Sequence, residues 1–117
     1  MKQSEHDLQV NCIKIFKIKY PSKMIFSIPN AGKRSVRAGV YYKAEGLLAG
    51  VPDLFVPEPT AEFSGLFIEM KTKERSSKLT DNQKNVIDNL KKRGYCVEVC
   101  RSIDEFIQVC NCYFTGA

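Results

Sequence analysis

The 117-residue sequence predicts an α/β fold in which helices flank a mixed central sheet. Two observations support this prediction. Helical and strand patterns alternate along the chain, in the order helix, strand, short helix, strand, strand, helix, strand, helix. The two central strand patterns, residues 50–56 and 65–71, flank one turn-rich segment and therefore resemble a β-hairpin. Because the chain has no linker, internal repeat or low-complexity tract, we expect residues 1–117 to form a single domain.

The first helix is predicted from Ser4 to Lys19, with Ser4 as its N-cap and an apolar stripe along one side. Glu5 lies in its first turn, where a carboxylate stabilises the positive end of a helix. This helix-end role is the simplest interpretation of Glu5. Tyr20-Pro21-Ser22 ends the helix, and the short apolar run over residues 24–28 predicts a buried strand.

A turn with adjacent cations follows this strand, over residues 29–34. Backbone N–H groups of such a turn, with Lys33, Arg34 and Arg37, could bind a phosphodiester without contacting bases. An ordinary solvated loop is the alternative interpretation. Residues 36–48 then have the composition of a short helix.

The central hairpin carries three charged residues. Strand alternation places Leu66, Ile68 and Met70 on one face of the second strand, and Phe67, Glu69 and Lys71 on the other. If the two strands are neighbours, Asp53 comes within a few ångströms of Glu69, because adjacent strands lie about 4.8 Å apart. Two carboxylates held so close repel each other unless a cation lies between them.

Oxygen ligands without His or Cys favour a hard cation such as Mg²⁺, which binds one or two carboxylates and keeps waters for a phosphate substrate to displace. An adjacent amine, here Lys71, could take a proton from the attacking water or hold the phosphate. The pattern therefore indicates phosphodiester hydrolysis. The alternative is an ordinary half-buried strand whose solvated face carries Glu69 and Lys71.

The connections and the third long helix follow. Residues 57–64 have the composition of an exposed loop, and residues 72–78, including Lys73, form a polar, basic segment that could contact substrate. A capping-box signature opens a helix over residues 80–93. Gln83 is then either the reciprocal cap of this helix or a residue that faces the site.

The C-terminal part is predicted as a strand over residues 95–100 and a helix over residues 102–113. It contains four of the five cysteines. Cys96 and Cys100 would be about 13 Å apart along a strand, too far to share one zinc ion. We therefore expect free thiols, as in a reducing compartment.

Bulk properties favour a polyanionic partner. The formal net charge is +5 and the sequence pI is about 9.0. No apolar run reaches the length of a signal peptide or membrane helix, so we expect a cytoplasmic protein.

Asp53 followed by Glu69-Met70-Lys71 is the pattern of the PD-(D/E)xK nuclease superfamily. The resemblance extends over nearly the whole chain. Together with other residues in the same order and spacing, this pattern resembles the virus-type replication-repair nuclease (VRR-NUC) family. The other residues are Asn30, Gly46, Gly50-Val51-Pro52-Asp53-Leu54, Gln83 and Gly94-Tyr95. This resemblance implies a restriction-endonuclease-like fold with an αβββαβ core.

The resemblance also implies roles. Residues matching Asp53 and Glu69 bind the divalent metal in that family, the residue matching Lys71 is catalytic, and a first-helix Glu, here Glu5, completes the acidic site. We expect Mg²⁺ or Mn²⁺, held by Asp53, Glu69 and the Met70 carbonyl, with Glu5 bound directly or through water. A Gln placed like Gln83 commonly faces the site in this superfamily.

A DNA endonuclease is the expected activity. Small stand-alone family members are typical of bacteriophages and bacteria and resemble homodimeric Holliday-junction resolvases, so a homodimer that cuts four-way junctions in a bacterial cell is the specific expectation. Candidate DNA contacts are Asn30, Lys33, Arg34, Arg37 and Lys73. Two alternatives remain: a non-catalytic nucleic-acid-binding accessory protein, and a nuclease without junction selectivity.

Overall fold

The computed structural model describes residues 3–29, 36–74 and 77–116, with the side chains of residues 36–39 excepted. None of the helices in these ranges is long and apolar enough to cross a membrane. In chain order the elements are α1 (Glu5–Lys19), β1 (Phe26–Ser27), α2 (Val36–Ala44), β2 (Leu54–Val56), β3 (Leu66–Met70), α3 (Asp81–Lys92), β4 (Cys96–Cys100) and α4 (Ile103–Thr115).

The four strands form one sheet in the order β1-β2-β3-β4. β2 pairs antiparallel with both β1 and β3, and β3 pairs parallel with β4, because α3 carries the chain back between them. The sheet is therefore mixed, and the α/β fold class predicted from the sequence is confirmed. The predicted hairpin is also confirmed, with Leu54 opposite Ile68.

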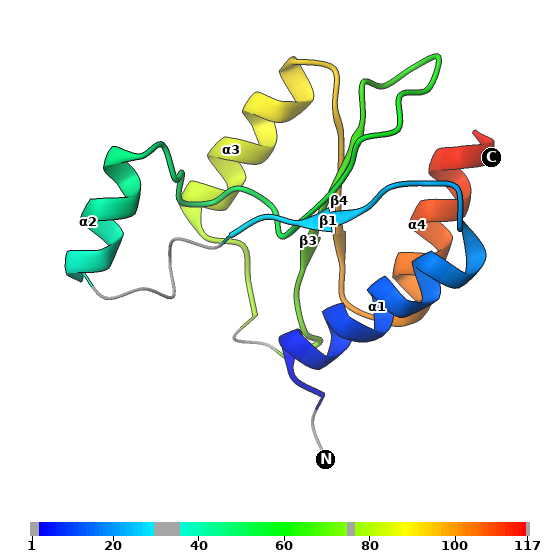
Figure 1. The fold of residues 1–117 in the computed structure, drawn as a ribbon, viewed down its shortest axis with the longest axis horizontal. Helices are drawn as coiled ribbons and strands as arrows, with labels where there is room; N and C mark the ends of the chain where they lie inside the picture. Colours follow the sequence, from blue (N-terminus) through cyan, green and yellow to red (C-terminus); the bar gives the residue numbers. More distant parts are fainter. Residues whose placement is uncertain (1–2, 30–35, 75–76, 117) are drawn as a thin grey trace.

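Helices cover both faces of the sheet: α1 and α4 lie against one face and α3 against the other (Figure 1). The main core lies between the sheet and the α1/α4 pair. There Leu66, Ile68 and Met70 have no exposed surface, as strand alternation predicts, and they pack in one cluster with residues of the two helices: Leu8, Cys12, Phe16, Phe106, Cys110 and Tyr113. On the opposite face, Phe67 stacks on Phe55 with ring centroids 4.3 Å apart.

Local hydrogen bonds fix the helix ends near the predicted positions. Ser4 caps α1 by accepting the N–H of Asp7, and Ser102 caps α4 by accepting the N–H of Glu105. α2 ends at Ala44, earlier than the predicted residue 48, because the chain enters a turn in which Gly46 has a φ of +104°.

The prediction of a buried strand over residues 24–28 is wrong. β1 is only two residues long and both are exposed, with Phe26 at 46% and the preceding Met24 at 58%. The physical reason is position: β1 lies at the edge of the sheet and, among the described strands, pairs only with β2. The Phe26 ring packs edge-on against Phe55 instead of entering the core.

The loop over residues 57–64 is anchored, contrary to the expectation of a simple exposed connection. The Tyr113 hydroxyl donates to the Glu58 carbonyl at 2.7 Å, and the Glu58 carboxylate accepts the N–H of Met24 at 3.1 Å. Phe63 stacks on Tyr113 with ring centroids 6.1 Å apart. The loop is held because its aromatic and carboxylate side chains find partners on neighbouring elements.

All five cysteines are free thiols, as expected. Three of them, Cys12, Cys100 and Cys110, are fully buried in the core, and burial raises the pKa of Cys100 and of Cys110 to about 12. These thiols therefore act as small apolar side chains.

Candidate active site

Asp53 and Glu69 are brought together by the pairing of β2 and β3. The register that places Leu54 opposite Ile68 continues to the preceding and following residues, so Asp53 lies at the level of Glu69. Asp53 is positioned by a hydrogen bond from the backbone N–H of Met70 to its Oδ2 at 2.8 Å. Its carboxylate therefore sits at the carboxyl end of β3, just before β2 begins.

Glu69 is a buried carboxylate with only one side satisfied. It is 2% exposed, although strand alternation alone was also compatible with a solvated face. Its Oε1 accepts a hydrogen bond from Gln83 Nε2 at 2.9 Å and lies 3.9 Å from Lys71 Nζ. Its Oε2 is buried and has no hydrogen-bond partner in the described part of the chain. A buried oxygen of this kind destabilises the folded state unless a hydrogen-bond donor or a cation contacts it.

The pKa of Glu69 is raised to about 8, mainly because burial removes the water that would stabilise its charge. The charge of Asp53 raises the pKa further, as does the hydrogen bond that a shared proton would make between the two carboxyls. The Lys71 ammonium opposes these effects only in part. The ionised pair is therefore short of positive charge.

Lys71 follows β3 directly and is held in the same packed layer. Its backbone N–H donates to the Cys100 carbonyl at 3.0 Å, which continues the pairing of β3 with β4. The residue is only 9% exposed, so its ammonium group lies beside Glu69 with little access to bulk water. The amine and the buried carboxylate share one face, as alternation predicts.

Gln83 makes both of the interactions that the sequence offered as alternatives. Its Oε1 accepts the N–H of Thr80 at 2.9 Å while Thr80 Oγ1 accepts the N–H of Gln83, which completes the capping box. Its Nε2 is left to donate to Glu69. The helix cap therefore fixes the orientation of the amide that faces the site.

Gly50 allows this approach of α3, a role that sequence analysis missed. A Cβ at this position would lie 2.6 Å from the Asn82 carbonyl oxygen and 2.9 Å from the backbone nitrogen of Gln83. Its φ of +92° is a conformation that L side chains rarely adopt. The glycine before Pro52-Asp53 was the available signal, since glycines commonly mark close backbone contacts.

Glu5 and Met70 contribute at the margin of the pair. Glu5 is half-buried in the first turn of α1, and its charge is among the effects that raise the pKa of Glu69. In a strand the N–H and C=O of one residue point to the same side, so the Met70 carbonyl points to the side on which its N–H meets Asp53.

A divalent cation fits this donor set. Carboxylate and carbonyl oxygens suit Mg²⁺ and Mn²⁺, and no described residue donates to the buried Glu69 Oε2, which lies close to the charge of Asp53. Within the described residues no three Asp, Glu, His or Cys side chains converge closely enough to hold an ion. The site is thus a pair, Asp53 and Glu69, with Glu5 farther away.

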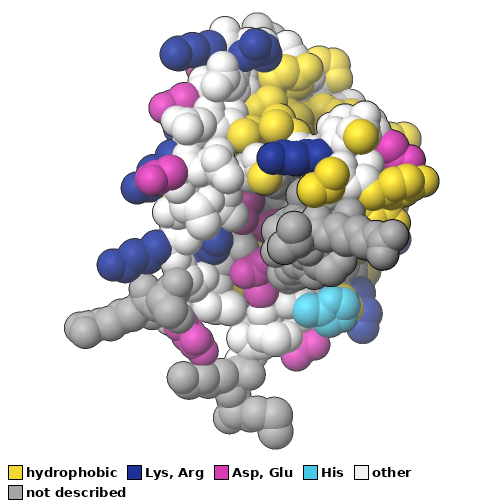
Figure 2. Space-filling view, turned by 90° about the vertical axis from the view of Figure 1, so that its left-hand side faces the viewer, with side chains coloured by type: hydrophobic (Ala, Val, Ile, Leu, Met, Phe, Trp, Pro, Cys, Tyr) yellow, Lys and Arg dark blue, Asp and Glu magenta, His cyan; other side chains and the backbone are white. Residues whose placement is uncertain are grey.

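The structure describes only some of the residues predicted to contact nucleic acid. Asn30, Lys33, Arg34 and the side chain of Arg37 lie outside the described residues. Lys73 is exposed, close after Lys71, and lines a hollow of about 650 Å³. Figure 2 shows acidic side chains set back in the middle of one face, with Lys and Arg side chains projecting beside them.

Arg101 is a second residue that sequence analysis missed. Its Nη1 donates to the carbonyls of Thr72 and Ser77, each at 2.7 Å, and so holds the segment that follows Lys71. The signal was its position directly after β4, the parallel neighbour of the strand that carries Glu69.

Comparisons with known proteins point to one family. The VRR-NUC domain family matches residues 3–104. A solved structure titled "VRR_NUC domain protein" is 27% identical and has a TM-score of 0.80, with 100% of this chain and 93% of that chain covered. Another, titled "VRR_NUC domain", is 20% identical with a TM-score of 0.61, covers 93% of this chain and 96% of its own, and bears on the fold alone. No curated protein matches significantly.

Proposed function

This chain belongs to the VRR-NUC domain family, which is a nuclease family, and from its site geometry we propose that it is a divalent-metal-dependent endonuclease that hydrolyses DNA phosphodiester bonds. One observation carries the proposal. Glu69 presents a buried oxygen to which no residue in the described ranges donates, beside a second carboxylate and an amine. A purely structural Glu at this place would be expected to have both oxygens satisfied.

Asp53, Glu69 and the Met70 carbonyl would hold Mg²⁺ or Mn²⁺, and Glu5 would support the ion directly or through a water molecule. The bound cation would supply Lewis-acid activation of the phosphate and neutralise charge in the transition state. The support is the arrangement of oxygens: the Asp53 carboxylate lies beside the backbone of Met70, and Glu69 lies at the level of Asp53.

Lys71 would position the attacking water as an ammonium, or take its proton once it has itself become a neutral amine. The water oxygen would bond to phosphorus while the bond from phosphorus to the leaving sugar oxygen breaks, and that oxygen would take up a proton. Lys71 suits this role because it is held beside Glu69 and largely shielded from solvent. Gln83 would keep the Glu69 carboxylate in one orientation during the reaction.

Basic and polar side chains near the site would bind the DNA backbone. Lys73 follows the site closely, and we propose Asn30, Lys33, Arg34 and Arg37 as further contacts. The net charge of +5 favours association with a polyanion, although the metal site itself is acidic. We propose that it acts in the cytoplasm of a bacterial cell, as a bacterial or phage protein.

Four-way junctions are the proposed preferred substrate, cut by a homodimer. A twofold dimer offers two sites to a twofold-symmetric junction. The support for a dimer is α2, which stands apart from the sheet and the other helices in Figure 1 and exposes 65% of Val40 and 64% of Tyr41. Apolar side chains exposed in this way are typical of surfaces that a partner covers.

The proposal is tested by cleavage of labelled four-way junction, flap and plain duplex DNA with and without Mg²⁺, using the wild type, Glu69→Ala and Lys71→Ala. We expect paired symmetric nicks in the junction, only with metal and only in the wild type. Equal cutting of all three substrates would remove the junction preference while leaving the nuclease. Binding of DNA without any cutting would favour an accessory DNA-binding protein.

A further inference from the structure

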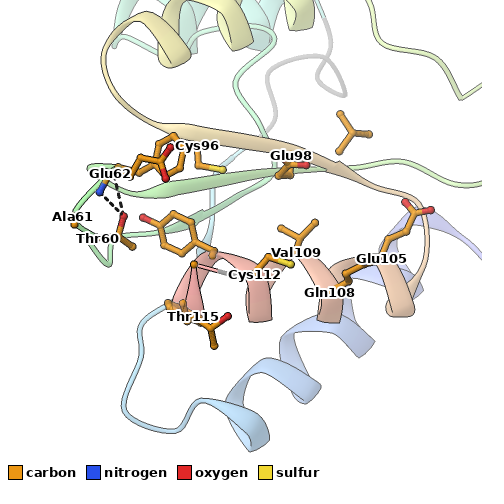
Figure 3. Close-up of a pocket in the computed structure, with 15 residues that line it drawn as sticks. Thr60, Ala61, Glu62, Cys96, Glu98, Glu105, Gln108, Val109, Cys112 and Thr115 are labelled. Atoms are coloured by element: carbon orange, nitrogen blue, oxygen red, sulfur yellow. Dashed lines mark hydrogen bonds between the residues drawn. The ribbon is translucent and has the colours of Figure 1, made fainter.

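A groove of about 800 Å³ lies outside the active site and shares no residue with it. It runs between β4, the loop over residues 60–63 and the outer side of α4 (Figure 3). One side of the groove follows the edge of the sheet, because among the described strands β4 pairs with β3 alone and is the last in the order.

The lining of the groove combines an apolar surface with carboxylates. Phe63, Val109 and Tyr113 are among its apolar residues, while its charged residues are three exposed glutamates: Glu62, Glu98 and Glu105. No lysine or arginine is among the described residues that line it, although the whole chain has 18 Lys and Arg against 13 Asp and Glu. The groove is therefore negatively charged, whereas the protein as a whole is positively charged.

The carboxylates are largely free for a ligand. Glu62 and Glu98 take part in no ion pair within the part of the chain that the structure describes. Glu105 accepts the backbone N–H of Arg101 at 2.9 Å through Oε1. The nearby cation Lys23 lies over the ring of Phe114, which belongs to the lining, but its ion-pair partner is Glu58 at 3.9 Å and not one of the three glutamates.

The free edge of β4 adds backbone donors and acceptors. The Cys96 N–H donates to the Gly65 carbonyl and the Cys100 carbonyl accepts the Lys71 N–H, so alternate residues from Cys96 direct their backbone groups to β3. Val97 and Val99 therefore direct theirs to the open edge. None of the hydrogen bonds among the described residues uses these groups.

We propose that this groove binds an extended basic segment of a partner protein, which pairs with the free edge of β4. Main-chain hydrogen bonds to Val97 and Val99 would align the segment, and its alternate apolar side chains would lie on the face of β4 opposite to Glu98. Its Lys or Arg side chains would enter the groove, where their charges meet Glu98 on the strand and Glu62 and Glu105 at the rim and their alkyl chains pack on the apolar lining. Nucleic acid does not fit here, because three carboxylates repel phosphate.

The charge of Glu98 should also determine which partner segments can pair with β4. A glutamate in the middle of an exposed edge strand disfavours pairing with neutral or acidic strands, which is a common protection of free edges. The same carboxylate favours a basic strand by complementarity. Glu98 is thus expected to decide which segments can pair with β4.

The test uses short fluorescent peptides that alternate Val with Lys, Thr or Glu, with anisotropy to measure binding to the full chain. We expect the Val/Lys peptide to bind at least about tenfold more tightly than the others, and to shift the NMR amide signals of Val97 and Val99. Glu98→Lys should reverse the preference towards the Val/Glu peptide. Asp88→Lys, the same charge change at an exposed position of α3, should leave it unchanged.

Three outcomes would overturn the proposal. The first is no binding of the Val/Lys peptide, and the second is binding that Glu98→Lys does not alter. The third is a set of amide shifts centred on Asp53 and Glu69, which would mean that the peptide binds the acidic active site instead.

Discussion

Gln83 donates from Nε2 to Glu69 Oε1 at 2.9 Å while its own Oε1 accepts the N–H of Thr80 at the same distance. One side chain thus joins the first turn of α3 to the buried carboxylate of β3. Because both ends of the amide are used, its rotation is restricted, and the orientation of Glu69 depends on a helix cap. The cap and the site can be separated by mutation.

Thr80→Ala and Gln83→Ala separate the two roles. Thr80→Ala removes the hydroxyl cap but leaves Gln83 able to reach Glu69, so it should lower the free energy of unfolding by about 1 kcal/mol with little effect on cleavage. Gln83→Ala should cost a similar stability and also slow cleavage about tenfold or more, since a buried acceptor loses its donor. Urea unfolding and single-turnover cleavage measure the two effects. Equal cleavage rates in both variants would assign Gln83 to the cap alone.

The raised pKa of Glu69 predicts a pH-dependent stability. In the folded protein this pKa is about 8 and its ordinary value is 4.5, so the folded state binds more protons between these values. The carboxyl's contribution to stability is therefore fully present below about pH 4.5 and is lost as the pH rises through about 8. In the presence of a chelator, Glu69→Gln should flatten this slope in denaturant titrations. An unchanged slope in the variant would show that another group causes it.

Binding of a divalent cation should restore the stability that the protein loses as the pH rises towards 8. A divalent cation stabilises the ionised carboxylates, so Mg²⁺ at about 100 times its dissociation constant should add about 2.7 kcal/mol to the free energy of unfolding of the wild type. The increase should be larger at pH 8 than at pH 6, as the proton competes for Glu69. Thermal unfolding with Mg²⁺ and with a chelator measures it. Glu69→Gln and Asp53→Asn should respond weakly; a full response in both would place the ion elsewhere.

Much of the site could be predicted from sequence because it rests on local geometry. The two-residue period of a strand puts Glu69 and Lys71 on one face, and the turn-rich segment between two apolar runs puts Asp53 on the neighbouring strand. Neither inference needs knowledge of distant residues. The capping box that orients Gln83 was visible for the same reason.

What could not be predicted depends on contacts between distant elements. Alternation does not say which face another element covers, so the burial of Glu69 and the exposure of Phe26 both required the tertiary structure. The role of Arg101 also depends on a chain reversal, since its carbonyl partners Thr72 and Ser77 lie far away in sequence. Composition gave no signal for such partners.

Lys71→Met should abolish most of the cleavage without loss of metal binding. Methionine keeps much of the volume and removes the ammonium that lies 3.9 Å from Glu69, so the rate should fall by about 10² to 10⁴. Lys73→Met removes the same charge at an exposed position and should chiefly weaken DNA binding and reduce its salt dependence. Cleavage at saturating DNA, with calorimetry of Mg²⁺ binding, distinguishes the two. Equal losses of rate at saturation would argue against a special role of Lys71.

Gly50→Ala and Gly46→Ala test whether the close approach of α3 builds the site. Both glycines have positive φ, +92° and +104°, but only at Gly50 would a Cβ meet another atom, the Asn82 carbonyl oxygen at 2.6 Å. Gly46→Ala should therefore cost only the backbone strain, about 1 kcal/mol, whereas Gly50→Ala should cost about 2 to 4 kcal/mol. The added methyl must push the start of α3 away, which breaks the hydrogen bond from Gln83 to Glu69. Cleavage should therefore slow in Gly50→Ala alone. Chemical unfolding and single-turnover rates measure both effects. If Gly50→Ala loses stability but cleaves at the wild-type rate, the contact serves folding and not the orientation of Glu69.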